Sequence, residues 1–287
     1  FILLFFNLNS NNVKQNKKIS LEIFQIFSPV NTFDKDSIQI DIINKIKNSD
    51  AEYIIFAENN YPYLISDINS IEILKHIKDN AKVIIGATKT DKNKIYNSFL
   101  FLEQDNVQIF DKQILVPFGE FLPFRKYLKF LENISGNVDY TAGTKDRIIK
   151  SSDQVNILPV ICYEIIFNKI LRKINKKEIN ILINITNDSW FGNTLGPYQH
   201  FYHTRMRALI SNKYLLRVSN NGISAIIDNN GTVLNFTKLN TKNSFKHSIE
   251  IKDTIYFGTI HNFFIFYLIL IIFFNFIFYK YNYKYGK

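Results

Sequence analysis

A long apolar stretch near the C-terminus constrains this chain more than any other feature. Residues 263–279 read FFIFYLILIIFFNFIFY, and Asn275 is the only strongly polar residue among them. A helix that crosses a bilayer needs roughly 20 apolar residues, with a lower limit of about 17. Because the preceding FGTIHN supplies the missing turn, we predict one transmembrane helix over residues 257–279.

The residues after this stretch predict its orientation. Residues 280–287 contain Lys280, Lys284 and Lys287 and no acidic residue. Positively charged flanks of membrane helices stay in the cytoplasm. We therefore expect a basic cytoplasmic tail over residues 280–287 and the large preceding domain on the periplasmic face of a bacterial inner membrane.

The opening of the chain, FILLFFNLNS, does not read as a signal peptide. A signal peptide begins with basic residues and ends at a cleavage site of small residues, and neither is present here. We expect residues 1–10 to be the remnant of a preceding membrane helix. The rest of that membrane part would then belong to a longer chain or to a separately encoded N-terminal half.

Composition fits a large folded domain rather than a nucleic-acid binder. The chain has 287 residues, of which 46% are hydrophobic, and its formal net charge is +10. Its lysines are scattered except in NKILRKINKKE at 168–178, and no zinc-finger spacing or RNA-binding aromatic signature accompanies them. We expect a surface that faces anionic lipid and no nucleic-acid partner.

Strands and helices are predicted to alternate along the remaining chain, which favours a layered α/β fold. The helices are predicted over 34–48, capped by Asp34, over 66–79 and over 198–212. Strands are predicted over 19–27, 52–58, 82–87, 97–103, 156–162, 178–186 and 214–220, with a hairpin over 223–234 that turns at Asn230-Gly231.

Three residues that suit nucleophilic catalysis stand at or after strand ends, where α/β folds place their ligand sites. Cys162 is the only cysteine, and a thiol needs a base or a cation to become a nucleophile. Glu58 could take the thiol proton, and Lys112 could stabilise the thiolate and a later oxyanion. From spacing alone, these residues fit structural roles equally well: Glu58 as a solvated carboxylate, Lys112 as an ordinary loop lysine and Cys162 as a small buried side chain.

Two histidines leave alternatives open. His200 is a possible partner for Cys162 in a Cys-His dyad. His200 and His203 also form an H-x-x-H pattern, but no cysteine or carboxylate pattern accompanies it. We predict no metal and no cofactor.

Three sequence words resemble the nitrilase (carbon-nitrogen hydrolase) superfamily and, within it, the bacterial apolipoprotein N-acyltransferases. They are FDKQILVPFGEFLPF at 110–124, VICYEIIF at 160–167 and the segment 184–231 that begins NITNDSWFGN. The resemblance implies a nitrilase-like αββα sandwich over residues 19–256, followed by one C-terminal transmembrane helix. It also implies a Glu-Lys-Cys triad, which consists of Glu58, Lys112 and Cys162.

The same resemblance implies roles for further residues. Glu120 and Glu164 match carboxylates that support the lysine and the site, and Tyr163 and Glu164 are expected to line and polarise the cleft. Trp190 and Phe191 match aromatic residues near the lipid-handling site, although Trp190 fits a core position equally well.

The implied reaction has two substrates. Cys162 would take an acyl chain from a phospholipid as a thioester and pass it to the N-terminal diacylglyceryl-cysteine amine of an apolipoprotein. The base motif departs from the family's Trp-Pro-Glu-Thr, since Phe56-Ala57-Glu58-Asn59 stands here, and this predicts a looser turn. Two alternatives stay open: a nitrilase-type amidohydrolase acting on a small amide, and an inactive membrane-anchored remnant.

Overall fold

The computed structural model falls into two units, residues Phe1–Thr254 and Ile255–Lys287, and each is described by itself. The structure describes residues 17–27, 34–132, 138–172, 178–192, 194–251 and 266–276.

The first unit contains two six-stranded sheets. In the first sheet, β1, β2 and β3 run parallel, β12 pairs antiparallel with β1, and β4 and β5 extend the other edge antiparallel in turn. Its order is β12 (Asn243–Ile251), β1 (Lys17–Gln25), β2 (Tyr53–Ile55), β3 (Lys82–Asp91), β4 (Lys94–Glu103) and β5 (Asn106–Asp111).

The second sheet repeats this plan. Strands β7, β8 and β9 run parallel, and antiparallel strands lie at both edges. Its order is β11 (Val233–Phe236), β10 (Ala225–Ile227), β9 (Tyr214–Ser219), β8 (Ile181–Thr186), β7 (Asn156–Ile161) and β6 (Ile149–Lys150).

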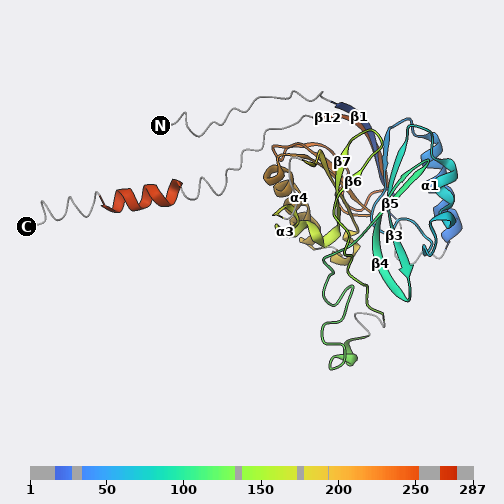
Figure 1. The fold of residues 1–287 in the computed structure, drawn as a ribbon, viewed down its shortest axis with the longest axis horizontal. Helices are drawn as coiled ribbons and strands as arrows, with labels where there is room; N and C mark the ends of the chain where they lie inside the picture. The colour runs from blue at the N-terminus through green and yellow to red at the C-terminus, as the bar shows by residue number, and fades with distance from the viewer. Residues whose placement is uncertain are drawn as a thin grey trace, which may run out of the picture. The chain divides into compact units, whose positions relative to one another are not determined.

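The sheets pack face to face, with helices on their outer faces (Figure 1). The central core joins side chains of both sheets, such as Phe99 of the first and Ile183 of the second. Helix α1 (Lys35–Asn48) covers the first sheet, and α3 (Lys169–Arg172) and α4 (Gly196–Ser211) cover the second. Each fully buried aliphatic or aromatic side chain contributes about 1.5–3 kcal/mol, so this core accounts for the layering. The predicted αββα sandwich is confirmed.

Helix α1 shows how local signals determine an element. Asp34 caps it by accepting a hydrogen bond from the backbone N–H of Ser37 at 3.0 Å. Ile42 and Ile46 lie on one face and are fully buried against the first sheet. The helix predicted over 34–48 is confirmed.

The helix predicted over 66–79 is wrong. Two short 3-10 turns occupy this region, Ile68–Ser70 and Glu72–His76, and they are separated by Ile71 in an extended conformation. The apolar positions here recur every three residues, which is the repeat of a 3-10 helix rather than of an α-helix. The side chain of Asp67 also accepts the backbone N–H of Asn69 at 3.1 Å, which ends the preceding extended segment in a turn.

Strand β12 was not predicted. It pairs with β1 along nine residues, yet its side chains are mostly polar and exposed. A strand of this composition shows little of the apolar alternation that marks a half-buried strand.

The C-terminal predictions are less well supported. Residues 266–276 form a helix with mostly exposed apolar side chains. Within the part of the chain that the structure describes, no helix reaches the length and apolar content needed to span a bilayer, so the predicted transmembrane helix is not supported. The rest of 257–279, together with residues 1–10 and 280–287, lies outside the described residues.

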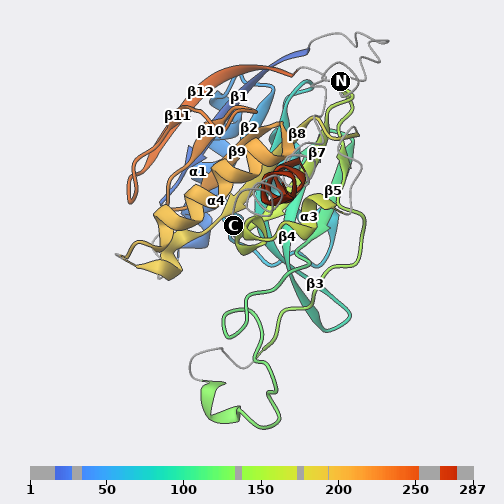
Figure 2. The same cartoon turned by 90° about the vertical axis from the view of Figure 1, so that its left-hand side faces the viewer.

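The connection between β5 and β6 extends beyond the edge of the sandwich (Figure 2). Both of its ends are fixed near the sheets, because the N–H of Lys112 donates to the carbonyl of Asn97 at 2.8 Å and the N–H of Gly143 donates to the carbonyl of Lys112 at 2.8 Å. This connection supplies one wall of the site described next.

Candidate active site

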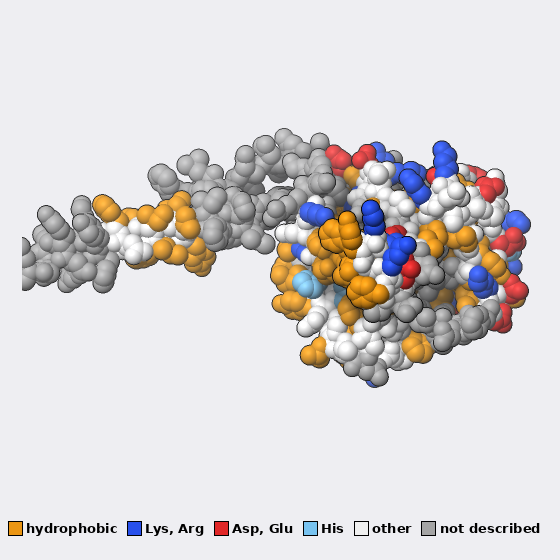
Figure 3. Space-filling view, turned by 90° about the horizontal axis from the view of Figure 1, so that it is seen from below, with side chains coloured by type: hydrophobic (Ala, Val, Ile, Leu, Met, Phe, Trp, Pro, Cys, Tyr) orange, Lys and Arg blue, Asp and Glu red, His pale blue; other side chains and the backbone are white. Residues whose placement is uncertain are grey.

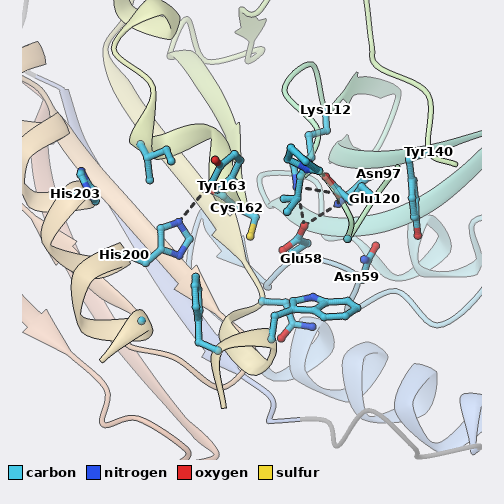
Figure 4. A pocket seen from close by; sticks show the side chains of 18 of the residues that line it. Glu58, Asn59, Asn97, Lys112, Glu120, Tyr140, Cys162, Tyr163, His200 and His203 are labelled. Carbon is cyan, nitrogen blue, oxygen red and sulfur yellow. Dashed lines mark hydrogen bonds and ion pairs between the residues drawn. The ribbon is translucent and has the colours of Figure 1, made fainter. Parts of the chain in front are cut away.

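A cavity of about 480 Å³ opens at the carboxyl ends of strands from both sheets. Figure 4 shows its side chains, which approach one another from the two sheets and from α4. The predicted site residues that line it are Glu58, Lys112, Glu120, Cys162, Tyr163, Trp190 and Phe191. The structure therefore gathers into one cavity all but one of the predicted residues.

Cys162 follows directly after β7 and begins a 3-10 turn, Cys162–Ile166. Its φ of 48° lies in the left-handed region, which is uncommon for a residue with a side chain and occurs often at functional sites. The half-buried thiol points into the cavity. Burial, together with the negative charge of Glu58, raises the pKa of Cys162 to about 12, although Lys112 opposes this shift.

Glu58 lies in the turn after β2 and is 5% exposed. Its Oε1 accepts a hydrogen bond from Asn97 Nδ2 at 2.7 Å and lies 3.7 Å from Lys112 Nζ. Its Oε2 is buried and accepts no hydrogen bond of normal geometry from the residues that the structure describes. Burial raises the pKa of Glu58 above its ordinary value, and the charge of Lys112 opposes that rise. A buried carboxylate with one unoccupied oxygen is suited to accept a proton.

Lys112 follows directly after β5 and is 1% exposed. Its Nζ lies 2.8 Å from Oε1 of Glu120, and Asn97 donates to that same oxygen at 2.8 Å. The other oxygen of Glu120 accepts the backbone N–H of Val116 at 2.9 Å. Burial disfavours the ammonium, but the negative charges around it outweigh that effect and raise the pKa of Lys112, which keeps it charged.

The turn that carries Glu58 is fixed although proline is absent from position 57. The backbone N–H of Ala57 donates to Oδ1 of Asn60 at 2.8 Å, a bond that proline could not make. Gly86 of β3 packs against this turn so closely that a Cβ there would lie 2.5 Å from the Cα of Glu58. Asn60 and Gly86 therefore restrain this turn in the absence of proline.

Glu164 is the one predicted site residue that does not line the cavity, which corrects the expectation that it lines the cleft with Tyr163. It is fully buried, and both of its oxygens accept hydrogen bonds from the guanidinium of Arg147, at 2.6 and 2.7 Å. Its side chain points into the protein because the short turn after Cys162 directs it there.

His200 does not form a dyad with the thiol. Its Nε2 lies 3.2 Å from the backbone carbonyl oxygen of Cys162 (Figure 4) rather than pairing with the sulfur. Its Nδ1 lies 2.9 Å from Oδ1 of Asp188. Arg217 donates to Asp188 at 2.7 Å. Burial, together with the charge of Arg217, lowers the pKa of His200, and Asp188 opposes that shift. This buried cluster supports the backbone below the nucleophile.

The aromatic residues occupy the outer part of the cavity. Trp190 is 78% exposed, which excludes the core position that the sequence left open. Phe191 packs against the ring of His200 with centroids 5.7 Å apart, and Tyr163 makes an edge contact with Phe167 at 5.0 Å. The cavity thus combines a charged interior with an apolar outer part.

Sequence reasoning missed Asn97 and Arg147. Asn97 joins Glu58 and Glu120 from the inner face of β4, and its only signal was an amide shortly before the apolar run at 99–102. Arg147 carried no signal, because its role depends on Glu164, a residue 17 positions further along the chain.

Comparison with known proteins agrees with this geometry. The carbon-nitrogen hydrolase family model matches residues 40–255. A protein from Rickettsia typhi named apolipoprotein N-acyltransferase is 37% identical over 193 residues, which cover 67% of this chain and 38% of that protein. One of the same name from Brucella melitensis is 35% identical over 197 residues, covering 63% and 36%. The matched region thus spans well under half the length of these relatives.

Solved structures share the fold at low sequence identity. A CN-hydrolase superfamily protein from Xanthomonas campestris superposes with a TM-score of 0.62 and 15% identity, covering 81% of this chain and 91% of that one. Nit3 of Saccharomyces cerevisiae, a nitrilase superfamily member, gives 0.63 and 17%, covering 84% and 92%. Because the family model spans more than half of the 287 residues, this chain belongs to the carbon-nitrogen hydrolase family.

Proposed function

We propose that this chain is the catalytic part of an apolipoprotein N-acyltransferase. The observation that carries the proposal is the meeting of Glu58, Lys112 and Cys162 in one cavity, with the free oxygen of Glu58 available as a base. The names of the relatives supply the reaction class.

The first half-reaction acylates the enzyme. Glu58 takes the proton of Cys162, and the sulfur attacks the ester carbonyl of a phospholipid. Lys112 stabilises the resulting oxyanion, since a preorganised cation acts where negative charge develops. The C–O bond of the ester then breaks, Glu58 returns its proton to the departing alkoxide, and a lysophospholipid leaves a thioester on Cys162.

The second half-reaction transfers the acyl group. The amine of a diacylglyceryl-cysteine attacks the thioester carbonyl, and Glu58 takes a proton from the attacking nitrogen. The C–S bond breaks, the acyl group becomes an amide, and the sulfur recovers a proton. Two successive transfers through one covalent intermediate predict ping-pong kinetics.

A surface rich in exposed aromatic residues supports membrane contact. The segment after the cavity wall exposes Phe124, Tyr127 and Phe130 at 73–78%, interleaved with the exposed Lys126 and Lys129. Figure 3 shows hydrophobic side chains next to lysines and arginines on this face. Segments that combine exposed aromatic and basic side chains bind at the surface of membranes that contain anionic lipids.

We extend the proposal to topology. The catalytic domain faces the periplasm, residues 257–279 span the inner membrane, and residues 280–287 are cytoplasmic. A reporter fused after Lys287 tests this: cytoplasmic behaviour is expected, and periplasmic behaviour would contradict the topology.

Covalent trapping tests the chemistry. The full chain is incubated with phosphatidylethanolamine vesicles, or with a short-chain p-nitrophenyl ester that requires no membrane, and is analysed by mass spectrometry. We expect an acyl adduct that hydroxylamine removes, and we expect Cys162→Ala to lose it. An adduct that persists in Cys162→Ala, or a folded wild type that gives none with either donor, would refute the assignment.

The acceptor separates the transferase from an amidohydrolase. Adding a diacylglyceryl-cysteine peptide to the acylated enzyme should give N-acylated peptide. Release of free fatty acid alone, at a rate that the peptide does not change, would instead favour the hydrolase, since water would then be the acceptor.

A further inference from the structure

The ion pair between Arg147 and Glu164 lies outside the active-site cavity, next to the two chain segments that carry Lys112 and Cys162. Arg147 is 7% exposed and Glu164 is fully buried. The guanidinium donates in parallel from Nη1 and Nη2 to the two carboxylate oxygens, at 2.7 and 2.6 Å. Such bidentate pairs are among the strongest and most directional contacts in proteins.

Glu164 uses the same two oxygens to hold three backbone N–H groups. Gln113 and Ile114 donate to Oε1 at 2.9 and 3.1 Å, and Ile161 donates to Oε2 at 2.9 Å. Gln113 follows Lys112 directly, and Ile161 precedes Cys162 directly. One carboxylate therefore connects the peptide next to the cation with the peptide next to the nucleophile.

This connection bridges the two sheets. Lys112 follows β5 of the first sheet, and Cys162 follows β7 of the second. The distance between them thus depends on how the ends of two different sheets meet. Glu164 links these two ends by direct hydrogen bonds to both.

The two oxygens of Glu164 together accept from five N–H donors, two of Arg147 and three of the backbone, which matches the acceptor capacity of a carboxylate. A protonated carboxyl would direct an O–H toward groups that are themselves donors. A buried carboxylate without a counter-charge is strongly destabilised, and Arg147 supplies that charge. Arg147 is in turn held by the carbonyl of Pro159 at 3.2 Å, by Oε1 of Gln113 at 3.1 Å and by the ring of Phe110 at 4.6 Å.

We propose that Arg147 is a positioning residue that sets the spacing between Lys112 and Cys162 by holding the side chain of Glu164 in place between the two sheets. The inference rests on the proposed role of Cys162 as the nucleophile. Among the described residues, the contacts of Arg147 are to groups outside the active-site cavity, so it acts on the reaction through Glu164 and Gln113 rather than on the substrate.

The position of Arg147 makes a specific test possible. Arg147 lines a second cavity of about 470 Å³, which shares no lining residue with the active-site cavity. In Arg147→Ala, a free guanidinium ion can enter through this second cavity and remake the two parallel bonds. Methylammonium carries the same charge but cannot bind in a bidentate manner.

The experiment measures the acylation rate of Cys162 in the full chain with a p-nitrophenyl ester. We expect Arg147→Ala to lower that rate about 100-fold with little change in KM, because displacement of a catalytic group by about 1 Å can cost that much. Millimolar guanidinium should recover about tenfold of the loss, and methylammonium should not. Arg147→Lys should remain slow, and Arg205→Ala, which removes an exposed arginine bonded to the carbonyl of Gly231, should match the wild type.

A second variant covers the case in which Arg147→Ala does not fold. The double variant Arg147→Met with Glu164→Gln removes both charges, which proteins often tolerate. We expect it to fold and to acylate slowly, without rescue by guanidinium. Wild-type acylation in Arg147→Ala or in the double variant would overturn the inference. A folded wild type that is never acylated would instead refute the proposed function.

Discussion

Lys112 makes its closer ion pair with Glu120, at 2.8 Å, and lies 3.7 Å from Glu58. Glu120 uses both of its oxygens, one for Lys112 and Asn97 and the other for the N–H of Val116. Within the described part of the chain, one oxygen of Glu58 accepts no hydrogen bond of normal geometry. The two carboxylates therefore differ in what they can do: Glu120 holds the ammonium in place, and Glu58 has the capacity to accept a proton.

This difference predicts the effect of Glu120→Gln. The amide keeps the size of the side chain but cannot hold the ammonium of Lys112 by charge. We expect the acylation rate of Cys162 to fall about 100-fold, because displacing a catalytic group by about 1 Å can reduce a rate by that factor. The thermal unfolding midpoint should change little. Glu132→Gln serves as the control, since Glu132 pairs only with Arg125 on the projecting connection among the described contacts. Equal rates in the two variants would show that Glu120 does not position the lysine.

The resting state of the thiol predicts a second outcome. With a pKa of about 12, Cys162 is about 10⁻⁴ thiolate at pH 8, whereas a free thiol of pKa 8.5 is about one quarter thiolate. Alkylation of the resting protein by iodoacetamide should therefore be slow at pH 7 and should rise steadily beyond pH 10. A plateau near pH 8.5 or below would indicate that Lys112 already holds a thiolate before substrate binds.

Lys112→Arg tests the oxyanion donor. The guanidinium is broader than an ammonium and cannot occupy the same point between Glu58 and Glu120. Removing one preorganised donor costs roughly 100- to 1000-fold in rate, and we expect a loss of that size in Cys162 acylation with the domain still folded. Lys126→Arg, a change at an exposed lysine on the nearby connection, is the control. If Lys112→Arg and Lys126→Arg react equally fast, Lys112 has no role in the mechanism.

Asn60 should contribute to both stability and activity. In Asn60→Ala the buried N–H of Ala57 loses its acceptor, which costs about 1–3 kcal/mol of unfolding free energy. The turn that carries Glu58 would also lose a restraint, so acylation should slow. Urea unfolding and the acylation assay measure the two effects, and Asn80→Ala at an exposed position provides the comparison. A variant as stable and as fast as Asn80→Ala would show that Gly86 alone fixes the turn.

The sequence predicted those parts of the molecule that depend on neighbouring residues. The cap at Asp34 and the apolar face of α1 are local signals, and the structure contains both. The short apolar runs before Glu58 and Cys162 correctly placed these residues at or just after strand ends, because a strand buried on both faces is recognisable from its composition.

Features that depend on packing between distant segments could not be predicted in this way. The pairing of β12 with β1 joins the two ends of the first unit, and nothing in the polar sequence of β12 identifies its partner. The contacts of Glu164 likewise require the second sheet to pack against the connection after β5. The position of His200 below the carbonyl of Cys162, rather than beside its sulfur, depends on how α4 lies on its sheet.

The division of the proposed catalytic residues between the two sheets has a consequence for the unfolded and partly unfolded chain. Glu58 and Lys112 come from one layer and Cys162 from the other. While the layers are apart, the thiol lies in water with an ordinary pKa near 8.5, and no base or cation is fixed beside it. It then reacts as any free cysteine does, with oxidants and alkylating agents but not with esters. The reactivity of Cys162 toward an ester thus depends on the assembled sandwich. Measuring that reactivity therefore shows whether the two sheets are packed together.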